Sequence, residues 1–244
     1  PAAPPAPEAK ASPAPPAAPA KDGREAIRRG IEFLRAHQNP DGSIADADDP
    51  QMKMPGMTAI AVYAMAKSPS MYRSDDPVTA KAVAFILKHV QPDGSICNPE
   101  RGLSNYNTSL SAMALIALED RAYQPVIDKA LAFTRGHQKN AANGFDKDKD
   151  PLYGSIGYGS KGPKHGDLSN TKIAAEFLEA AGVDKKDPMW QDMLVFVTRL
   201  QNDAETSDRG KFPGTEMFPV SPNPEDKGGF IYSFDESKGD TKET

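Results

Sequence analysis

Apolar residues recur at helical spacing in four segments of the chain, and each segment ends at a glutamine. In the last segment, for example, Met193, Val197 and Leu200 would share one helix face. The glutamines are separated by 53, 47 and 63 residues. This spacing predicts a repeat of about 50 residues, with one helix ending near each of residues 38, 91, 138 and 201.

Proline and aspartate mark the expected starts of these helices. Pro77, Pro125 and Pro188 lie 13 or 14 residues before the glutamines, and Asp76 and Asp187 precede two of them. Aspartate is a good N-cap, and proline at the first helical position loses no hydrogen bond. We therefore expect helices of three to four turns.

A turn follows each of the first two helices. Residues 40–44 and 92–96 both read Pro-Asp-Gly-Ser-Ile, which favours a tight turn. In the third repeat we expect the turn at Asn143-Gly144-Phe145, and in the fourth near Gly210.

A second, more apolar helix is expected after each of the first three turns, over residues 56–66, 107–118 and 170–181. These segments are rich in Ala, Met and Leu and should be buried on most sides, whereas the first helices carry charged outer faces. Alternating half-exposed and buried helices predicts an all-α fold with two concentric layers, stacked because one helix pair cannot cover its own apolar face.

Two of the repeats resemble the QW motif of squalene and hopene cyclases, which reads basic, small, aromatic, aliphatic, Gln and then Gly-x-Trp. The matching residues are Arg29-Gly30, Phe33-Leu34, Gln38 and Gly42, and then Lys129-Ala130, Phe133, Gln138 and Gly144-Phe145. The chain thus resembles the terpenoid cyclase and protein prenyltransferase superfamily. This resemblance implies an α/α-toroid with a cavity lined by the inner helices. Because no second helix is expected after the fourth outer helix, we expect an incomplete ring.

In the cyclases, the proton donor is the middle acid of an Asp-x-Asp-Asp-Thr motif at the start of an inner helix. Asp46, Asp48 and Asp49 match its letters, although nine residues separate Asp48 from Thr58. Asp167 aligns with the motif by its spacing to a threonine, but Ser169 and Asn170 then stand where acids are needed. We therefore take Asp46, Asp48, Asp49 and Asp167 as candidate catalytic residues, with the cyclase acid absent from its aligned position.

The prenyltransferase resemblance implies a zinc ion held by Asp, Cys and His. Cys97 is the only cysteine, with His165 and Asp167 as conceivable partners; we favour a packing role for Cys97 and expect neither metal nor cofactor. A structural role at the helix end is expected for His37 and its repeats His89 and His137.

The loop at residues 153–162 is the best candidate for ligand contact. It is rich in glycine and leads into the third inner helix. We expect Tyr153, Tyr158, Lys161 and His165 to face the mouth of a cavity. A phosphate loop is disfavoured because no strand precedes it and no Gly-Lys-Ser/Thr follows.

Composition sets the domain boundaries. The first 20 residues contain eight Pro and nine Ala, so we expect a linker over residues 1–22, repeats over 23–201 and a polar Gly/Pro-rich segment over 202–244 that leads to a missing repeat. Such a linker favours export to the periplasm or cell envelope behind a signal peptide or tether, with a cytoplasmic protein as the alternative. The net charge of −5 argues against nucleic acid, and no segment is apolar enough to span a membrane.

Taken together, these features favour a binding or scaffold module with a concave inner-helix surface. Its ligand would be an isoprenoid, a lipid or a polysaccharide, and the open ring edge allows association. The alternatives are an isoprenoid cyclase or prenyltransferase-type enzyme, or an α/α-barrel carbohydrate-active enzyme with paired carboxylates.

Overall fold

The computed structural model describes residues 22–45, 49, 53–159 and 165–234. This part of the chain contains seven α-helices, four short 3₁₀ helices and no β-strand. The α-helices are α1 (Gly23–Ala36), α2 (Pro55–Lys67), α3 (Pro77–Leu87), α4 (Ser104–Ala117), α5 (Gln124–His137), α6 (Leu168–Ala180) and α7 (Pro188–Leu200). The 3₁₀ helices are η1 (Arg121–Tyr123), η2 (Ala141–Asn143), η3 (Arg209–Lys211) and η4 (Pro224–Asp226). The all-α prediction is confirmed, and none of these helices is long and apolar enough to cross a bilayer.

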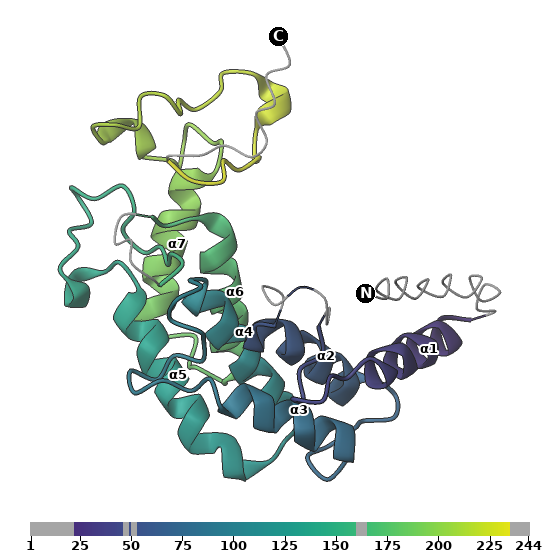
Figure 1. Ribbon diagram of the computed structural model, residues 1–244. Helices are drawn as coiled ribbons and strands as arrows, with labels where there is room; N and C mark the ends of the chain where they lie inside the picture. Colours follow the sequence, from purple (N-terminus) through teal and green to yellow (C-terminus); the bar gives the residue numbers. More distant parts are fainter. Residues whose placement is uncertain (1–21, 46–48, 50–52, 160–164, 235–244) are drawn as a thin grey trace, which may run out of the picture.

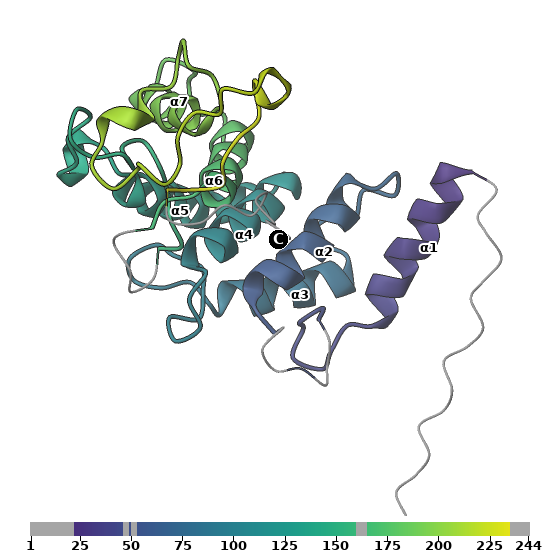
Figure 2. The ribbon, with the colours of Figure 1, turned by 90° about the horizontal axis from the view of Figure 1, so that it is seen from above.

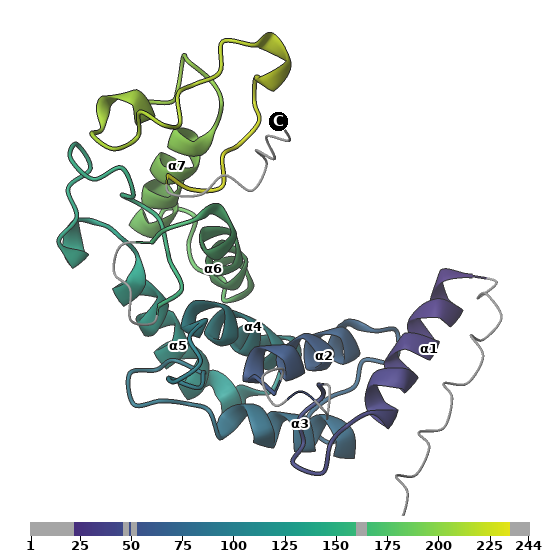
Figure 3. The same ribbon diagram turned by 45° about the horizontal axis from the view of Figure 1, so that its top comes forward.

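The helices form an arc of two layers (Figures 1 and 3). Helices α2, α4 and α6 lie side by side on the concave side, and α3, α5 and α7 lie behind them. Helix α1 stands at one end of the arc and α7 at the other (Figure 2). The main core fills the space between the layers, from Ile31 of α1 to Phe177 of α6. Because α4 has neighbours on both sides, even its polar residues Ser109 and Ser111 are fully buried.

One hydrogen bond ties each turn to its inner helix. In three repeats the hydroxyl of an inner-helix threonine accepts the backbone N–H of the isoleucine that ends a Gly-Ser-Ile turn. The pairs are Ile44 with Thr58 at 3.1 Å, Ile96 with Thr108 at 2.9 Å and Ile156 with Thr171 at 3.1 Å.

The glycine of each turn touches the next outer helix. Gly42, Gly94 and Gly154 have φ values of 97°, 89° and 90°, which favour glycine. A Cβ atom on them would lie 2.3, 2.4 and 1.7 Å from the carbonyl oxygens of residues 81, 129 and 192, in α3, α5 and α7. The turn therefore sets how closely consecutive repeats approach.

The predicted third and fourth turns are misplaced. The third turn is Gly154-Ser155-Ile156, because Lys139 N–H donates to the Ser155 carbonyl at 2.9 Å just as Asn39 N–H does to Ser43 at 2.8 Å. The fourth lies at Gly228-Gly229-Phe230, where Asn202 N–H donates to Gly229 at 2.7 Å. Residues 140–153 and 203–227 are insertions that move these turns away from their expected positions.

The repeated histidines have the structural role that was predicted. His37, His89 and His137 each place Nδ1 within 2.7–3.0 Å of the carbonyl oxygen four residues earlier and pack against the phenylalanine there. This register puts Val90, not Gln91, at the position of Gln38 and Gln138. Gln91, which ends the second segment in the sequence pattern, is therefore not the repeat equivalent of Gln38 and Gln138.

Side chains at the ends of the outer helices reach the start of the next outer helix. Gln38 Nε2 donates to the Val78 carbonyl at 2.8 Å. Arg35 makes two hydrogen bonds, of 2.7 and 2.9 Å, to Asp76, which caps α3 as predicted. The same contacts recur between α5 and α7, where Gln138 donates to Met189 and Arg135 to Asp187. These contacts therefore link α1 to α3 and α5 to α7.

The free energy of unfolding should decrease at acid pH because Asp76 becomes protonated. Its hydrogen bonds with Arg35 hold the pKa at about 2, below the ordinary value of 3.8. Because the folded-state pKa is depressed, this stability is complete above pH 4–5 and is lost as pH falls toward 2; it amounts to roughly 2 kcal/mol. We expect Asp76→Asn to be destabilised at pH 7 and to lose less stability between pH 5 and pH 3 than the parent, measured by urea unfolding. The exposed neighbour variant Asp75→Asn should match the parent, and equal pH slopes for parent and Asp76→Asn would contradict the assignment.

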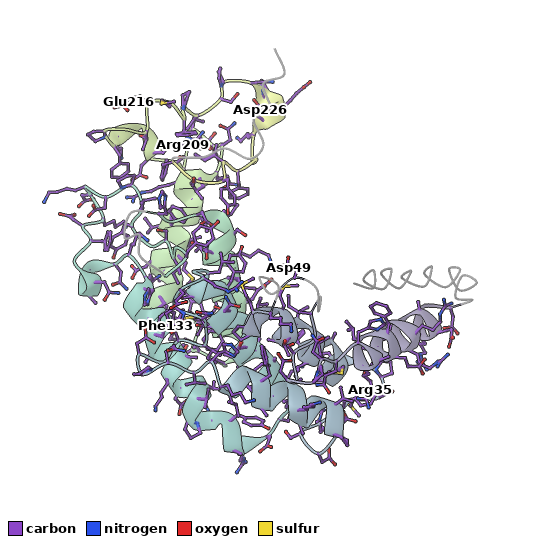
Figure 4. The ribbon with its side chains drawn as sticks, viewed as in Figure 1. Arg35, Asp49, Phe133, Arg209, Glu216 and Asp226 are labelled. Carbon is purple, nitrogen blue, oxygen red and sulfur yellow. The ribbon has the colours of Figure 1, made fainter. Side chains whose placement is uncertain are left out.

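The segment after α7 is organised by a buried arginine. Figure 4 shows Arg209 within the residues that fold over the C-terminal end of α7. Its side chain is 1% exposed, and burial lowers its pKa. Nη1 donates to the carbonyls of Leu200 and Gln201, both at 3.1 Å, and Nη2 donates to Asn202 Oδ1 at 3.0 Å and to Pro219 at 2.8 Å. A positive charge at the unpaired carbonyls of a helix C-terminus is favourable.

The last repeat leaves apolar side chains exposed. Leu194 and Phe230 are 56% and 49% exposed, whereas Val83 and Ile96, at the same repeat positions, are 2% and 0% exposed. Within the described residues, no inner helix follows Phe230.

Candidate functional site

Amide side chains occupy the starts of the inner helices α4 and α6. Asn107 Oδ1 accepts the backbone N–H of Gly56 at 2.9 Å, which joins α4 to α2. Asn105 Nδ2 donates to the carbonyl and to Oδ1 of Asn170, both at 3.0 Å, which joins α4 to α6. These buried amides are hydrogen-bonded to the neighbouring helices, so they serve the packing of the helices.

Asp167 is an N-cap. It is 3% exposed, and its two carboxylate oxygens accept the backbone and side-chain N–H groups of Asn170, both at 2.7 Å. Ser169, the next aligned position, hydrogen-bonds through its hydroxyl to that of Tyr106. Asp167 therefore caps α6, and Ser169 joins α6 to α4.

A groove runs along the concave side of the inner helices, and we call it the inner groove. It consists of two hollows of about 640 and 540 Å³ that share Ile60, Leu110 and Ile173, one residue from each inner helix. Volumes of this size are typical of small-molecule sites. Ile60 is 49% exposed in the groove, although most residues of α2 are buried. The groove is thus an open apolar surface.

Three tyrosines lie at the end of the groove where the inner helices begin. Tyr106 of α4, Tyr158 of the third-repeat loop and Tyr232 of the C-terminal segment line the larger hollow. The rings of Tyr106 and Tyr158 stack with centroids 6.4 Å apart. The pKa of Tyr232 is raised by burial, by hydrogen bonds with Tyr158 and Asp167 and by the charge of Asp167.

Charged residues line the other end. Lys67 of α2 and Glu176 and Glu179 of α6 line the smaller hollow, together with Tyr63 and Met113. From Met57 to Lys67, α2 rises about 15 Å, which is the length of the groove between its two ends. The groove therefore has a hydroxyl end, an apolar middle and a charged end.

Of the four predicted ligand contacts, only Tyr158 reaches the groove in the described structure. Tyr153 is 8% exposed and donates from its hydroxyl to Asp192 Oδ1 at 2.9 Å, so its predicted place at a cavity mouth is wrong. His165 is exposed and lies outside the groove lining; its carbonyl accepts Lys139 Nζ at 2.7 Å. Lys161 falls outside the described residues.

The loop that carries the candidate catalytic acids contributes none of the described residues that line the groove. Asp46 and Asp48 lie outside the described residues. Asp49 is half-buried in the loop before α2 (Figure 4) and is absent from the lining of both hollows.

The proposed zinc ligands are not brought together. Cys97 is 2% exposed, and its Sγ lies 3.4 Å from Ser95 Oγ in the second turn. In the described part of the chain, no group of three or more His, Cys, Asp or Glu side chains could hold a metal ion.

Sequence reasoning missed Tyr232, which lines the groove, and the buried Lys139, which interacts with Asp167. Tyr232 follows the fourth turn by two residues, as Tyr158 follows the third, and this repeat could have revealed it. Lys139 is 5% exposed, and burial lowers its pKa while the nearby charge of Asp167 offsets that effect.

No family model matches the chain, and no curated protein matches it.

Proposed function

We propose that the chain is part of an incomplete α/α-toroid, of the terpenoid cyclase and prenyltransferase type, that binds an elongated apolar ligand in the inner groove. Three repeats with the same turn, threonine and histidine contacts support the toroid. The uncovered apolar positions Leu194 and Phe230 support an incomplete ring.

The observation that carries the binding proposal is the exposed apolar floor of the groove. Apolar side chains at Ile60 and Tyr63 remain 49% and 41% exposed, although the α2 faces toward α3 and α4 are fully buried. At the same time the positions aligned with catalytic acids hold hydrogen-bonded Asn and Ser side chains. This combination favours binding over proton-transfer catalysis. A polysaccharide ligand would need more polar groups along the floor.

Binding of the uncharged dye Nile red tests the proposal. We expect one dye per chain, and we expect Ile60→Glu to weaken binding at least tenfold, because a carboxylate in the groove must be desolvated. Leu194→Glu is the matched control, since Leu194 is equally exposed but lies on the outer helix α7. It should leave the affinity within twofold.

Equal affinities for parent and Ile60→Glu would overturn the proposal. Thermal unfolding of both variants checks that any loss of binding is local.

A further inference from the structure

We infer that the inner groove selects an uncharged amphiphile, with a hydroxyl head group at the tyrosine end and a hydrocarbon chain along the floor. This inference rests on the proposed function and specifies the ligand of the same groove.

Among the described residues, the head-group end presents hydroxyl groups and no cation. None of the described residues that line the larger hollow is Lys, Arg or His. Its polar groups are the hydroxyls of Tyr106, Tyr158, Tyr232 and Ser169 and the amide of Asn107. A phosphate or diphosphate in an apolar groove needs basic side chains to replace its hydration. Tyrosine hydroxyls can instead donate to and accept from an alcohol.

The carboxyl group of Asp167 lies behind these tyrosines. It interacts with Tyr232, which in turn hydrogen-bonds Tyr158, and an acidic group at this place disfavours an anionic head group. The buried cation Lys139, which interacts with Asp167, donates to the backbone carbonyl of His165 and is absent from the lining of the hollow. Its ammonium group therefore offsets part of the charge of Asp167 without being presented to a ligand.

The opposite end also disfavours an anion. Lys67 is the only described cation that lines the smaller hollow, and it shares that hollow with Glu176 and Glu179. An anionic amphiphile is therefore unfavourable in either orientation. The apolar middle, formed by Ile60, Leu110 and Ile173, suits a chain that extends over about 15 Å.

Competition against Nile red with farnesol, farnesyl phosphate and the hydrocarbon farnesene tests the inference. We expect farnesol to bind at least tenfold more tightly than farnesyl phosphate. Tyr158→Phe keeps the ring and removes one hydroxyl; it should weaken farnesol at least fivefold and leave farnesene within twofold. Leu194→Glu should change none of the three affinities.

The failures of the two proposals are distinguishable. If Nile red itself fails to bind, the proposed function is wrong. If Nile red binds but farnesyl phosphate binds as tightly as farnesol or more tightly, only the head-group inference is overturned. Equal binding of farnesol to the parent and to Tyr158→Phe would also overturn it.

Discussion

Replacing Gly154 with alanine is expected to lower the free energy of unfolding by roughly 3–5 kcal/mol. The new Cβ atom would lie 1.7 Å from the carbonyl oxygen of Asp192, in the backbone of α7, where no side chain can move aside. The third turn or α7 must therefore shift, which disturbs the hydrogen bond between Ile156 and Thr171. Urea unfolding followed by circular dichroism measures the effect.

Gly144→Ala is the matched control. Gly144 has nearly the same φ, 86° against 90°, but nothing lies within 4 Å of its would-be Cβ atom. Alanine there should cost only the backbone strain, about 1 kcal/mol. Similar losses for the two variants would show that backbone strain, and not the contact between repeats, makes Gly154 necessary.

Replacing Arg209 with methionine should release the segment formed by residues 202–234 from α7. The substitution removes the charged donor of the carbonyls of Leu200, Gln201 and Pro219 and of the side chain of Asn202. The first two carbonyls and Asn202 keep backbone donors, from Ile231, Asp203 and Ser221, so the cost comes from the lost hydrogen bonds of the guanidinium and from the Pro219 carbonyl. Hydrogen bonds from a charged group contribute about 1.5–3 kcal/mol each, and relief from burying the charge offsets part of this. We expect a net loss of roughly 3 kcal/mol, seen as about a hundredfold faster proteolysis within the segment.

Arg209→Lys should rescue little, because one ammonium group cannot reach acceptors on both sides of the guanidinium. Arg101→Met removes an exposed arginine from a different loop and should leave proteolysis unchanged. Unaltered cleavage in Arg209→Met would show that the apolar contacts of Phe196 and Phe234 hold the segment without the arginine.

Local signals in the sequence predicted the helices well. The Asp-Pro pairs at residues 76–77 and 187–188 gave the starts of α3 and α7 to the residue, because capping chemistry is local. Turn placement failed in the third and fourth repeats, where Gly144 and Gly210 lie inside insertions. The Gly154-Ser155-Ile156 sequence was a better signal, since it repeats three letters of the two earlier turns.

The site was harder to predict than the fold. Tyr158 was identified from its loop, whereas Tyr153, five residues away, is packed against α7. The sequence shows that both are tyrosines but not which one faces the concave side, because that depends on the path of the insertion. Tyr232 lies 74 residues further along the chain, and only the closure of the fourth turn brings it beside Tyr158.

The junction after each outer helix has a practical consequence for protein engineering. Two residues separate Asn39 from Gly42, whereas 14 separate Lys139 from Gly154 and 25 separate Asn202 from Gly228, yet the same pair of backbone hydrogen bonds closes each junction. The same two hydrogen bonds thus close loops of very different length. The short junctions at residues 40–41 and 92–93 should therefore accept grafted peptides, such as epitopes or sensor elements, while the arc keeps its curvature.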